Sequence, residues 1–310
     1  MSGAPRTQPL FEVLVAALDA LVVRALLREY NVAATLNACG RALALSPWVA
    51  ADAVADGHEV SAPGWRWERH AGMDEPAERS VIARAVEVIT RAGHTPPMAW
   101  HTRSSDTRRL LVEYGGFLYD SDAYDDDLPY VIDVVGTEHD VLPYAFDTND
   151  MRFFNAGGFV LADDFARYCI DAFGHLYAEA AEVPRMMSVG VHLRIVRRPG
   201  RIAGLRRFVD YAASKPDVWF ARRDAVAHAW RAGLGFRSGV HGRFQPHSRG
   251  GCDTNRSPAH NRRRARICVA SELALRLHEC DLLHVAGQPR PPSPPSRIPC
   301  PGRQRAPDLC

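Results

Sequence analysis

The side chains best suited to acid–base chemistry lie in two stretches of this sequence. His192 ends an apolar run, and a histidine there can act as a general acid or base because its ordinary pKa lies near neutral pH. In the second stretch, a Pro-Tyr-x-Phe run ends abruptly in Asp147, Asn149 and Asp150. We predict that His192 and Asp150 are the catalytic acid and base, and that Asn149 orients the substrate. The alternative for His192 is a core histidine that is hydrogen-bonded to the backbone.

Three further residues of suitable chemistry lie at or near the ends of short extended runs. Glu59 and Trp67 belong to one such stretch, and Arg103 follows Trp100-His101-Thr102. We predict that Glu59, Trp67 and Arg103 bind the substrate, because ligands of α/β folds lie beyond the ends of the strands. The acidic run Asp125–Asp127 is either a solvated turn or part of the same site wall.

Short apolar strands alternate with amphipathic helices, and these elements must position the polar residues. Apolar side chains at helical spacing predict helices over residues 10–30, 47–56, 75–92, 107–114, 163–178, 201–214 and 224–231. Short extended runs predict strands over 32–39, 58–62, 96–101, 117–119, 141–146, 186–192 and 217–221, with ends near His58, Asp120, Asp147 and His192. This alternation is typical of parallel βα units, and about seven repeats predict an α/β fold that is a barrel or barrel-like sheet, partly complete.

Composition narrows the class of protein. The chain has 310 residues, of which 46% are hydrophobic and 24% charged, and its net charge of +2 gives no reason to expect nucleic acid. No apolar run is long enough for a membrane span, and we see no signal peptide. Cys39 and Cys169 lie in apolar surroundings that predict buried free thiols. We therefore expect a cytoplasmic protein with a small-molecule substrate and without nucleic-acid or membrane partners, and homo-oligomer formation is left open.

The sequence divides into three predicted segments. Residues 1–9 are a polar lead that we expect to be disordered, residues 10–235 form the folded domain, and residues 236–310 are an Arg/Pro/Cys-rich tail. The tail holds five of the seven cysteines and ten of the 22 prolines, so we expect it to bury too little apolar surface to fold. Its one apolar patch, Ile267–Leu283, predicts a helix. A nucleic-acid-binding arm, a Pro-rich ligand and an out-of-frame translation are the alternatives for this tail.

Four stretches, taken together and in this order, resemble the polysaccharide deacetylase (NodB-like) family, most closely its allantoinase branch. They are Gly57–Glu59 with Gly64–Trp67, Gly115–Tyr130, Pro143–Phe153 and Met186–Arg201. The resemblance runs from about Leu26 to Arg231 and implies a distorted (β/α) barrel. It also implies hydrolysis of a non-peptide C–N bond, either in an N-acetylated sugar or in the cyclic amide of the allantoin ring.

Two departures from the family pattern bear on catalysis. Metal-dependent members carry an early Asp-Asp pair, which is absent here, so we expect that the chain begins after that segment. Their His-x-x-x-His motif falls on Pro63 and Trp67. Proline offers no metal ligand, and tryptophan at the second place is typical of the allantoinase branch. We therefore predict no cofactor, no tightly bound metal, and allantoinase-like ring opening to allantoate with impaired turnover. The alternatives are an N-deacetylase acting on chitin or other sugars, and an inactive remnant or binding protein.

Overall fold

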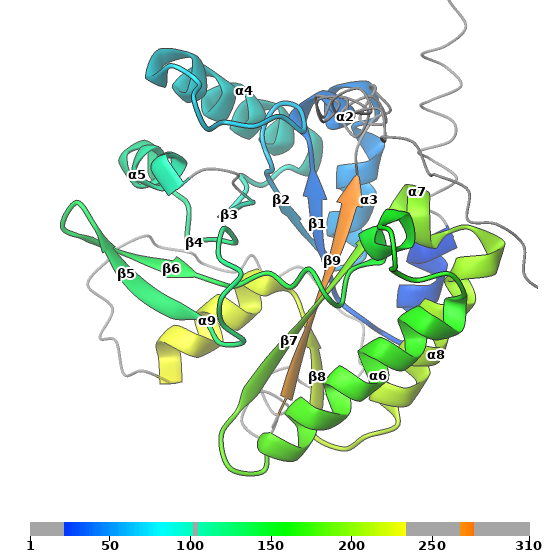
Figure 1. Cartoon of the computed structure of the whole chain (residues 1–310). Helices are drawn as coiled ribbons and strands as arrows, with labels where there is room; N and C mark the ends of the chain where they lie inside the picture. Colours follow the sequence, from blue (N-terminus) through cyan, green and yellow to red (C-terminus); the bar gives the residue numbers. More distant parts are fainter. Residues whose placement is uncertain (1–21, 102–104, 234–266, 276–310) are drawn as a thin grey trace, which may run out of the picture. The chain divides into compact units, whose positions relative to one another are not determined.

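Residues 22–101, 105–233 and 267–275 are described by the computed structural model of the chain (Figure 1). The strands are β1 (Thr35–Ala38), β2 (Glu59–Ser61), β3 (Ala99–Trp100), β4 (Tyr119–Asp120), β5 (Tyr130–Val134), β6 (Thr137–Val141), β7 (Arg185–His192), β8 (Val218–Ala221) and β9 (Ile267–Leu275). A helix over residues 22–29 precedes α2 (Gly40–Leu45), α3 (Trp48–Ala55), α4 (Glu75–Gly93), α5 (Ser105–Tyr114), α6 (Ala162–Glu179), α7 (Leu193–Val196), α8 (Pro199–Ala213) and α9 (Arg223–Gly233). A short 3-10 helix, η1, spans Asp150–Phe154.

The larger sheet brings together strands from both ends of the described chain. Its order is β2-β1-β9-β7, with β8 also paired to β9, and all of these pairs are parallel. β9 pairs with β7 from Arg185–Ile267 to His192–Ala274, while its first residues also face β8 and its last residues face β1. The last strand in sequence therefore lies in the middle of the sheet, as the orange arrow in Figure 1 shows.

The smaller sheet has the order β3-β4-β6-β5. β3, β4 and β6 are parallel, whereas β5 and β6 form an antiparallel hairpin. The hairpin turns at Val135 and Gly136, both of which have positive φ. A bridge between Ala62 and Trp100 joins the two sheets into one path of strands from β5 to β7. Among the described residues no ladder joins β5 to β7, so the path is left open there.

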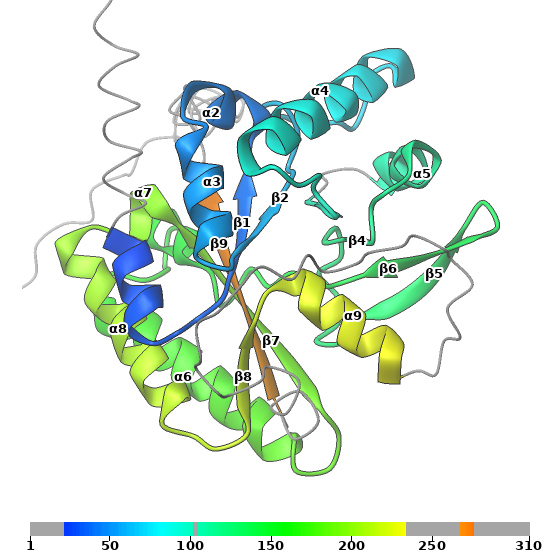
Figure 2. The same ribbon diagram turned by 180° about the vertical axis from the view of Figure 1, so that it is seen from behind.

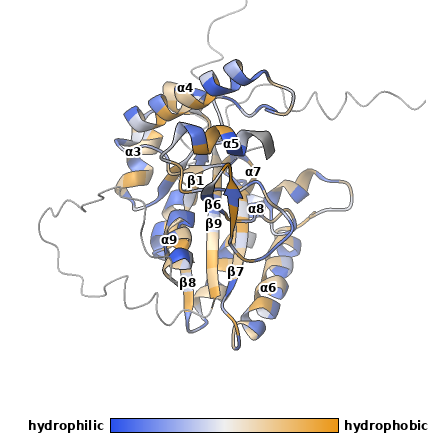
Figure 3. Ribbon diagram, turned by 90° about the vertical axis from the view of Figure 1, so that its left-hand side faces the viewer, coloured by the Kyte–Doolittle hydropathy of each residue, from blue (hydrophilic) through white to orange (hydrophobic). Residues whose placement is uncertain are grey.

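Amphipathic helices cover the sheets, as their apolar spacing predicts. α4 begins after Asp74, whose carboxylate accepts a hydrogen bond from the Ala77 N–H, and it buries Ile82, Ala85 and Ile89. α6 and α8 pack side by side (Figure 2), and the rings of their Phe173 and Phe208 meet edge to face at 6.3 Å. Fully burying such a side chain contributes about 1.5–3 kcal/mol. Figure 3 shows the central strands coloured largely as hydrophobic and the helices in mixed colours.

Two predictions about strand ends are confirmed and two are wrong. β4 ends at Asp120 and β7 ends at His192, as expected. His58 instead lies just before β2, where its Nδ1 accepts a hydrogen bond from the Ala34 N–H at 3.2 Å. Asp147 lies in an exposed loop after β6, because the Pro143 ring interrupts the extended run predicted over residues 141–146.

The expectation for the segment after residue 235 is wrong over residues 267–275. These residues form β9 rather than a helix or a disordered tail. Pairing with neighbouring strands buries their apolar side chains, and this burial stabilises the extended form although the composition around it is rich in Arg and Pro. The predicted lead at 1–9 and the remainder of the tail lie outside the described residues.

The structure also bears on the expectations for the cysteines and for membrane spans. Cys39 and Cys169 are both buried and outside any disulfide, as predicted. No helix within the described ranges is long and apolar enough to cross a membrane.

Candidate active site

Asp150 and His192 form a buried pair at the end of β7. Asp150 is the first residue of η1, and its Oδ1 lies 2.7 Å from His192 Nδ1. Its Oδ2 accepts a second hydrogen bond, at 2.8 Å, from the His192 backbone N–H. Burial raises the pKa of Asp150, and the contacts with His192 oppose that rise. One carboxylate oxygen thus orients the imidazole, and the other holds the His192 backbone.

Asn149 connects this pair to the neighbouring strands. Its Nδ2 donates to the Tyr144 hydroxyl at 2.6 Å, and its Oδ1 accepts from the Met151 N–H at 2.9 Å, which caps η1. Its backbone bridges to Gly190 of β7. A Cβ at Gly190 would collide with both the Asn149 amide and the Tyr144 hydroxyl, so a larger residue here would displace these two side chains.

A row of rings runs from the half-buried Trp67 to the surface. The Trp67 and His101 rings stack with centroids 5.6 Å apart, and His101 meets Tyr144 edge to face at 4.8 Å. Tyr144 in turn contacts Phe146, which stacks on Tyr124 with centroids 4.4 Å apart. Because Tyr144 also accepts from Asn149, this aromatic row adjoins the Asp150–His192 pair. Aromatic faces of this kind suit a flat ring or the apolar face of a sugar.

Glu59 lies in a buried network rather than at the rim. It accepts hydrogen bonds from the Thr35 hydroxyl at 2.7 Å, the Tyr119 hydroxyl at 2.9 Å and the Asp224 backbone N–H at 3.1 Å. Burial raises the pKa of Glu59 to about 7, and the negative charge of Asp224 adds to the rise.

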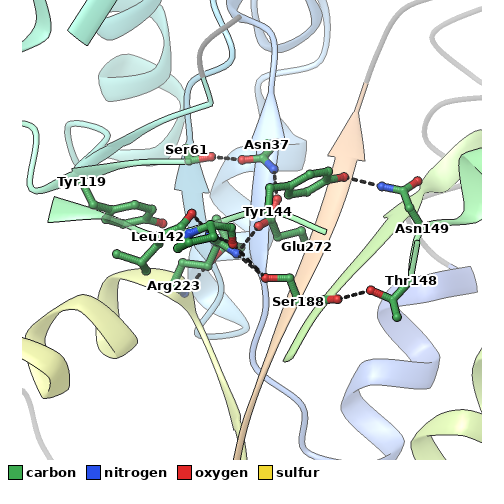
Figure 4. A network of polar contacts seen from close by, with 12 residues as sticks. Asn37, Ser61, Tyr119, Leu142, Tyr144, Thr148, Asn149, Ser188, Arg223 and Glu272 are labelled. Atoms are coloured by element: carbon green, nitrogen blue, oxygen red, sulfur yellow. Dashed lines mark hydrogen bonds and ion pairs between the residues drawn. The ribbon is translucent and has the colours of Figure 1, made fainter. Parts of the chain in front are cut away.

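Arg223, at the start of α9, is the buried cation of the same interior (Figure 4). Its guanidinium pairs with Glu272 of β9 at 2.5 Å. It also donates to the Ser188 hydroxyl and to the Pro143 carbonyl, each at 2.9 Å, and to the Leu142 carbonyl. The guanidinium therefore links the end of β6 to β7 and β9.

The strand registers separate these groups into two rows. One row runs from His192 through Ala274 and Asn37 to Ser61. The row two residues earlier runs from Gly190 through Glu272 and Thr35 to Glu59. Since all these strands are parallel, the His192 row is nearer the carboxyl ends, where ligands bind in α/β folds. Glu59 supports the site from the row behind it.

The metal of the metal-dependent proteins that this sequence resembles does not fit the residues present. Pro63 has no donor atom, and the Trp67 ring stacks against His101. Across the parts of the chain that the structure describes, no three His, Cys, Asp or Glu side chains are grouped so that they could hold a metal ion.

Of the predicted site residues, the structure brings Asp150 and His192 into direct contact, and Asn149 lies beside them as the residue that precedes Asp150 and bridges to Gly190 of β7. Trp67 joins them through His101 and Tyr144, and Glu59 belongs to the network behind. Arg103 lies outside the described residues. His101 and Tyr144 lie in two of the stretches described from the sequence, but neither was predicted as a site residue. Arg223 and Glu272 were missed, although an Arg-Arg pair after a predicted strand and a lone carboxylate inside an apolar run were the available signals.

Comparison with known proteins agrees with the fold and the family resemblance. The model of the polysaccharide deacetylase family matches residues 21–114. A Schizosaccharomyces pombe protein, whose name assigns it to the polysaccharide deacetylases, is 36% identical over 226 residues, which cover 67% of this chain and 71% of that one. The crystal structure of PuuE allantoinase is 42% identical with a TM-score of 0.68, covering 71% of this chain and 74% of that chain. A Pseudomonas aeruginosa structure named for polysaccharide deacetylase gives the same identity, TM-score and coverage.

The chain thus belongs to the polysaccharide deacetylase family, a class of enzymes that hydrolyse C–N bonds. Its fold is the α/β arrangement of the NodB-type (β/α) barrel, as predicted.

Proposed function

We propose that this chain hydrolyses the cyclic amide bond of an allantoin-like ureide. The observation that carries the proposal is the buried Asp150–His192 pair, which adjoins the aromatic row of Trp67, His101 and Tyr144. The similarity to PuuE allantoinase supports this substrate class.

In this proposal His192 is the acid–base group and Asp150 positions it. An ionised Asp150 accepts from Nδ1–H, which makes Nε2 the basic nitrogen of the ring. Nε2 takes a proton from the attacking water, and the resulting imidazolium donates a proton to the departing ring nitrogen. Asp150 accepts from the backbone N–H and from the Nδ1–H of His192, and its charge stabilises the imidazolium. Asp150 therefore exchanges no proton with the substrate.

Substrate orientation falls to the aromatic row and to Asn149. A hydantoin ring is flat and carries amide groups on its edge, so the faces of Trp67 and Tyr144 suit its plane. The Asn149 amide is held by Tyr144 and Met151 and thus has one fixed orientation beside the pair. Arg103 is proposed to bind the carbonyl oxygens of the substrate.

We expect slow turnover. The early Asp-Asp pair of the family pattern, which includes its catalytic base, is absent, and Pro63 stands where the family carries a histidine. A missing acid–base group costs about 10²- to 10⁴-fold in rate. The Pro63→His variant alone is therefore not expected to restore turnover, because the early Asp-Asp pair of the family pattern is absent as well.

The test is to incubate the purified full chain with allantoin and to measure allantoate by chromatography over hours. Slow formation of allantoate that is abolished by His192→Ala is the expected result. The matched control is His175→Ala, which alters an exposed histidine of α6 and should leave the rate unchanged.

Two other results would favour the alternatives. Release of acetate from chitin oligomers, with no allantoate from allantoin, would identify an N-deacetylase. No turnover of either substrate, with no change in melting temperature at millimolar allantoin, would identify a remnant without a working pocket.

A further inference from the structure

β9 contributes one carboxylate to the interior of the domain. Glu272 is only 2% exposed, and its register partners are Thr35 of β1 and Gly190 of β7. Its Oε1 lies 2.5 Å from Arg223 Nη1, and its Oε2 accepts from the Asn37 amide at 2.7 Å. Glu272 thus contacts groups on α9 and β1. Asn37 in turn accepts a hydrogen bond from the Ser61 hydroxyl of β2.

Arg223 carries the influence of Glu272 toward the Asp150–His192 pair. Its guanidinium donates to the Pro143 carbonyl, and Pro143 directly precedes Tyr144, whose hydroxyl holds Asn149. It also donates to the Ser188 hydroxyl. The Ser188 carbonyl accepts from Thr148, two residues before Asp150 (Figure 4). Both routes lead from one buried cation to the loop that holds Asp150.

The placement of that cation depends on a countercharge. Arg223 is 1% exposed, and Glu272 is its ion-pair partner within the described part of the chain. A buried guanidinium without a carboxylate is strongly unfavourable and moves toward water. If Arg223 shifts, the Pro143 carbonyl and the Ser188 hydroxyl lose a charged donor, and Tyr144 and Thr148 lose their fixed positions.

We propose that Glu272, supplied by a strand far along the chain from the other site residues, is a positioning residue that acts through Arg223 on the Asp150–His192 pair. For its effect on turnover this inference rests on the proposed function, whereas its effect on the structure of the pair does not. β9 is accordingly an integral part of the catalytic domain.

A double variant separates a positioning role for Glu272 from a role in stability alone. Glu272→Gln leaves Arg223 unpaired and should lower the melting temperature by about 10 °C. Glu272→Leu combined with Arg223→Met removes both charges and should restore the melting temperature to within a few degrees. A positioning role predicts that the double variant still hydrolyses allantoin at least about ten-fold more slowly, because the Pro143 carbonyl and Ser188 hydroxyl have lost their donor.

Hydrogen exchange gives a readout that needs no substrate. The Gly190 N–H donates to the Thr148 carbonyl at 3.2 Å, and the His192 N–H donates to Asp150. In the double variant these two amides should exchange at least about ten-fold faster than in the parent chain, with the β7–β9 ladder still protected. If allantoin is not the substrate, the kinetic measurement fails but this one still decides the role of Glu272.

Two controls complete the experiment. Glu179→Gln breaks the partly exposed ion pair with Arg185 at the start of β7 and should change neither the melting temperature nor the exchange rates. A chain that ends at residue 277 keeps β9 and should match the parent in melting temperature, whereas a chain that ends at residue 266 should lose cooperative unfolding. Parent-like exchange at Gly190 and His192 in the double variant, or parent-like melting of the chain that ends at 266, would overturn the proposal.

Discussion

At the scale of single residues, Asp150 is committed to His192 through both carboxylate oxygens. Asp150→Asn keeps the shape of the side chain but replaces one acceptor oxygen with an N–H donor, which disfavours Nδ1–H and so removes the base at Nε2. We expect the rate of allantoin hydrolysis to fall by about 10²- to 10⁴-fold with little change in fold.

The matched control for Asp150→Asn is Asp147→Asn, which alters an exposed carboxylate of the same loop. It should leave the rate within about two-fold, because Asp147 contacts only the Tyr168 hydroxyl among the hydrogen bonds of its side chain in the described residues. Equal rates for Asp150→Asn and the parent chain, measured by the same chromatography, would remove Asp150 from the mechanism.

Glu59 makes stability depend on pH. Burial raises its pKa from 4.5 to about 7, so in this window the folded chain keeps a proton that the unfolded chain has lost. The stability that protonated Glu59 contributes is therefore fully present below about pH 4.5 and is lost as pH rises to about 7. The loss is at most about 3.5 kcal/mol, given about 1.4 kcal/mol for each pKa unit.

Urea unfolding of the parent chain and of Glu59→Gln at pH 5 and pH 7.5 measures this effect. The free energy of unfolding of the parent should fall with rising pH by more than that of the variant, because glutamine does not titrate. The same pH dependence in both proteins would show that Glu59 is not the group responsible.

At the scale of elements, the β5–β6 hairpin carries a strained residue. Val135 has a φ of 54° at the turn and is 75% exposed, so its β-branched side chain occupies a left-handed conformation without compensating burial. Val135→Asn should raise the free energy of unfolding by about 1 kcal/mol, because Asn-Gly is the favoured pair for this turn. Thermal melting checks the direction, and Val134→Asn, at a buried strand position, should instead destabilise.

At the scale of the whole molecule, β9 requires the longest closure in the described fold. Its Glu272 pairs with Thr35, a separation of 272 − 35 = 237 residues. Contacts this distant form late, since the entropy of closing the loop must be lost before any pairing is gained. Pulse-labelling hydrogen exchange during refolding should show β9 amides protected in the slowest phase, after those of α4. Protection of β9 together with α4 in one early phase would contradict this order.

The sequence alone determined much of the fold through local patterns. The apolar stripe of α4 and the apolar run of β7 depend on neighbours close in the chain, so the periods of helix and strand are visible without tertiary contacts. For the same reason His192 could be placed at the end of a strand and Asp150 at the start of a polar loop. The β5–β6 hairpin was missed because its Val-Gly turn lacks the usual turn residues.

Tertiary structure alone decided where β9 lies and what Glu272 and Arg223 do. A nine-residue apolar run in an Arg/Pro-rich segment has no local signal that separates strand from helix. Only the open place between β1 and β7 makes the extended form favourable, because pairing on both sides satisfies its backbone and buries its side chains. The Glu272–Arg223 ion pair likewise exists only once the sheet has brought the two residues together, since no sequence spacing connects them.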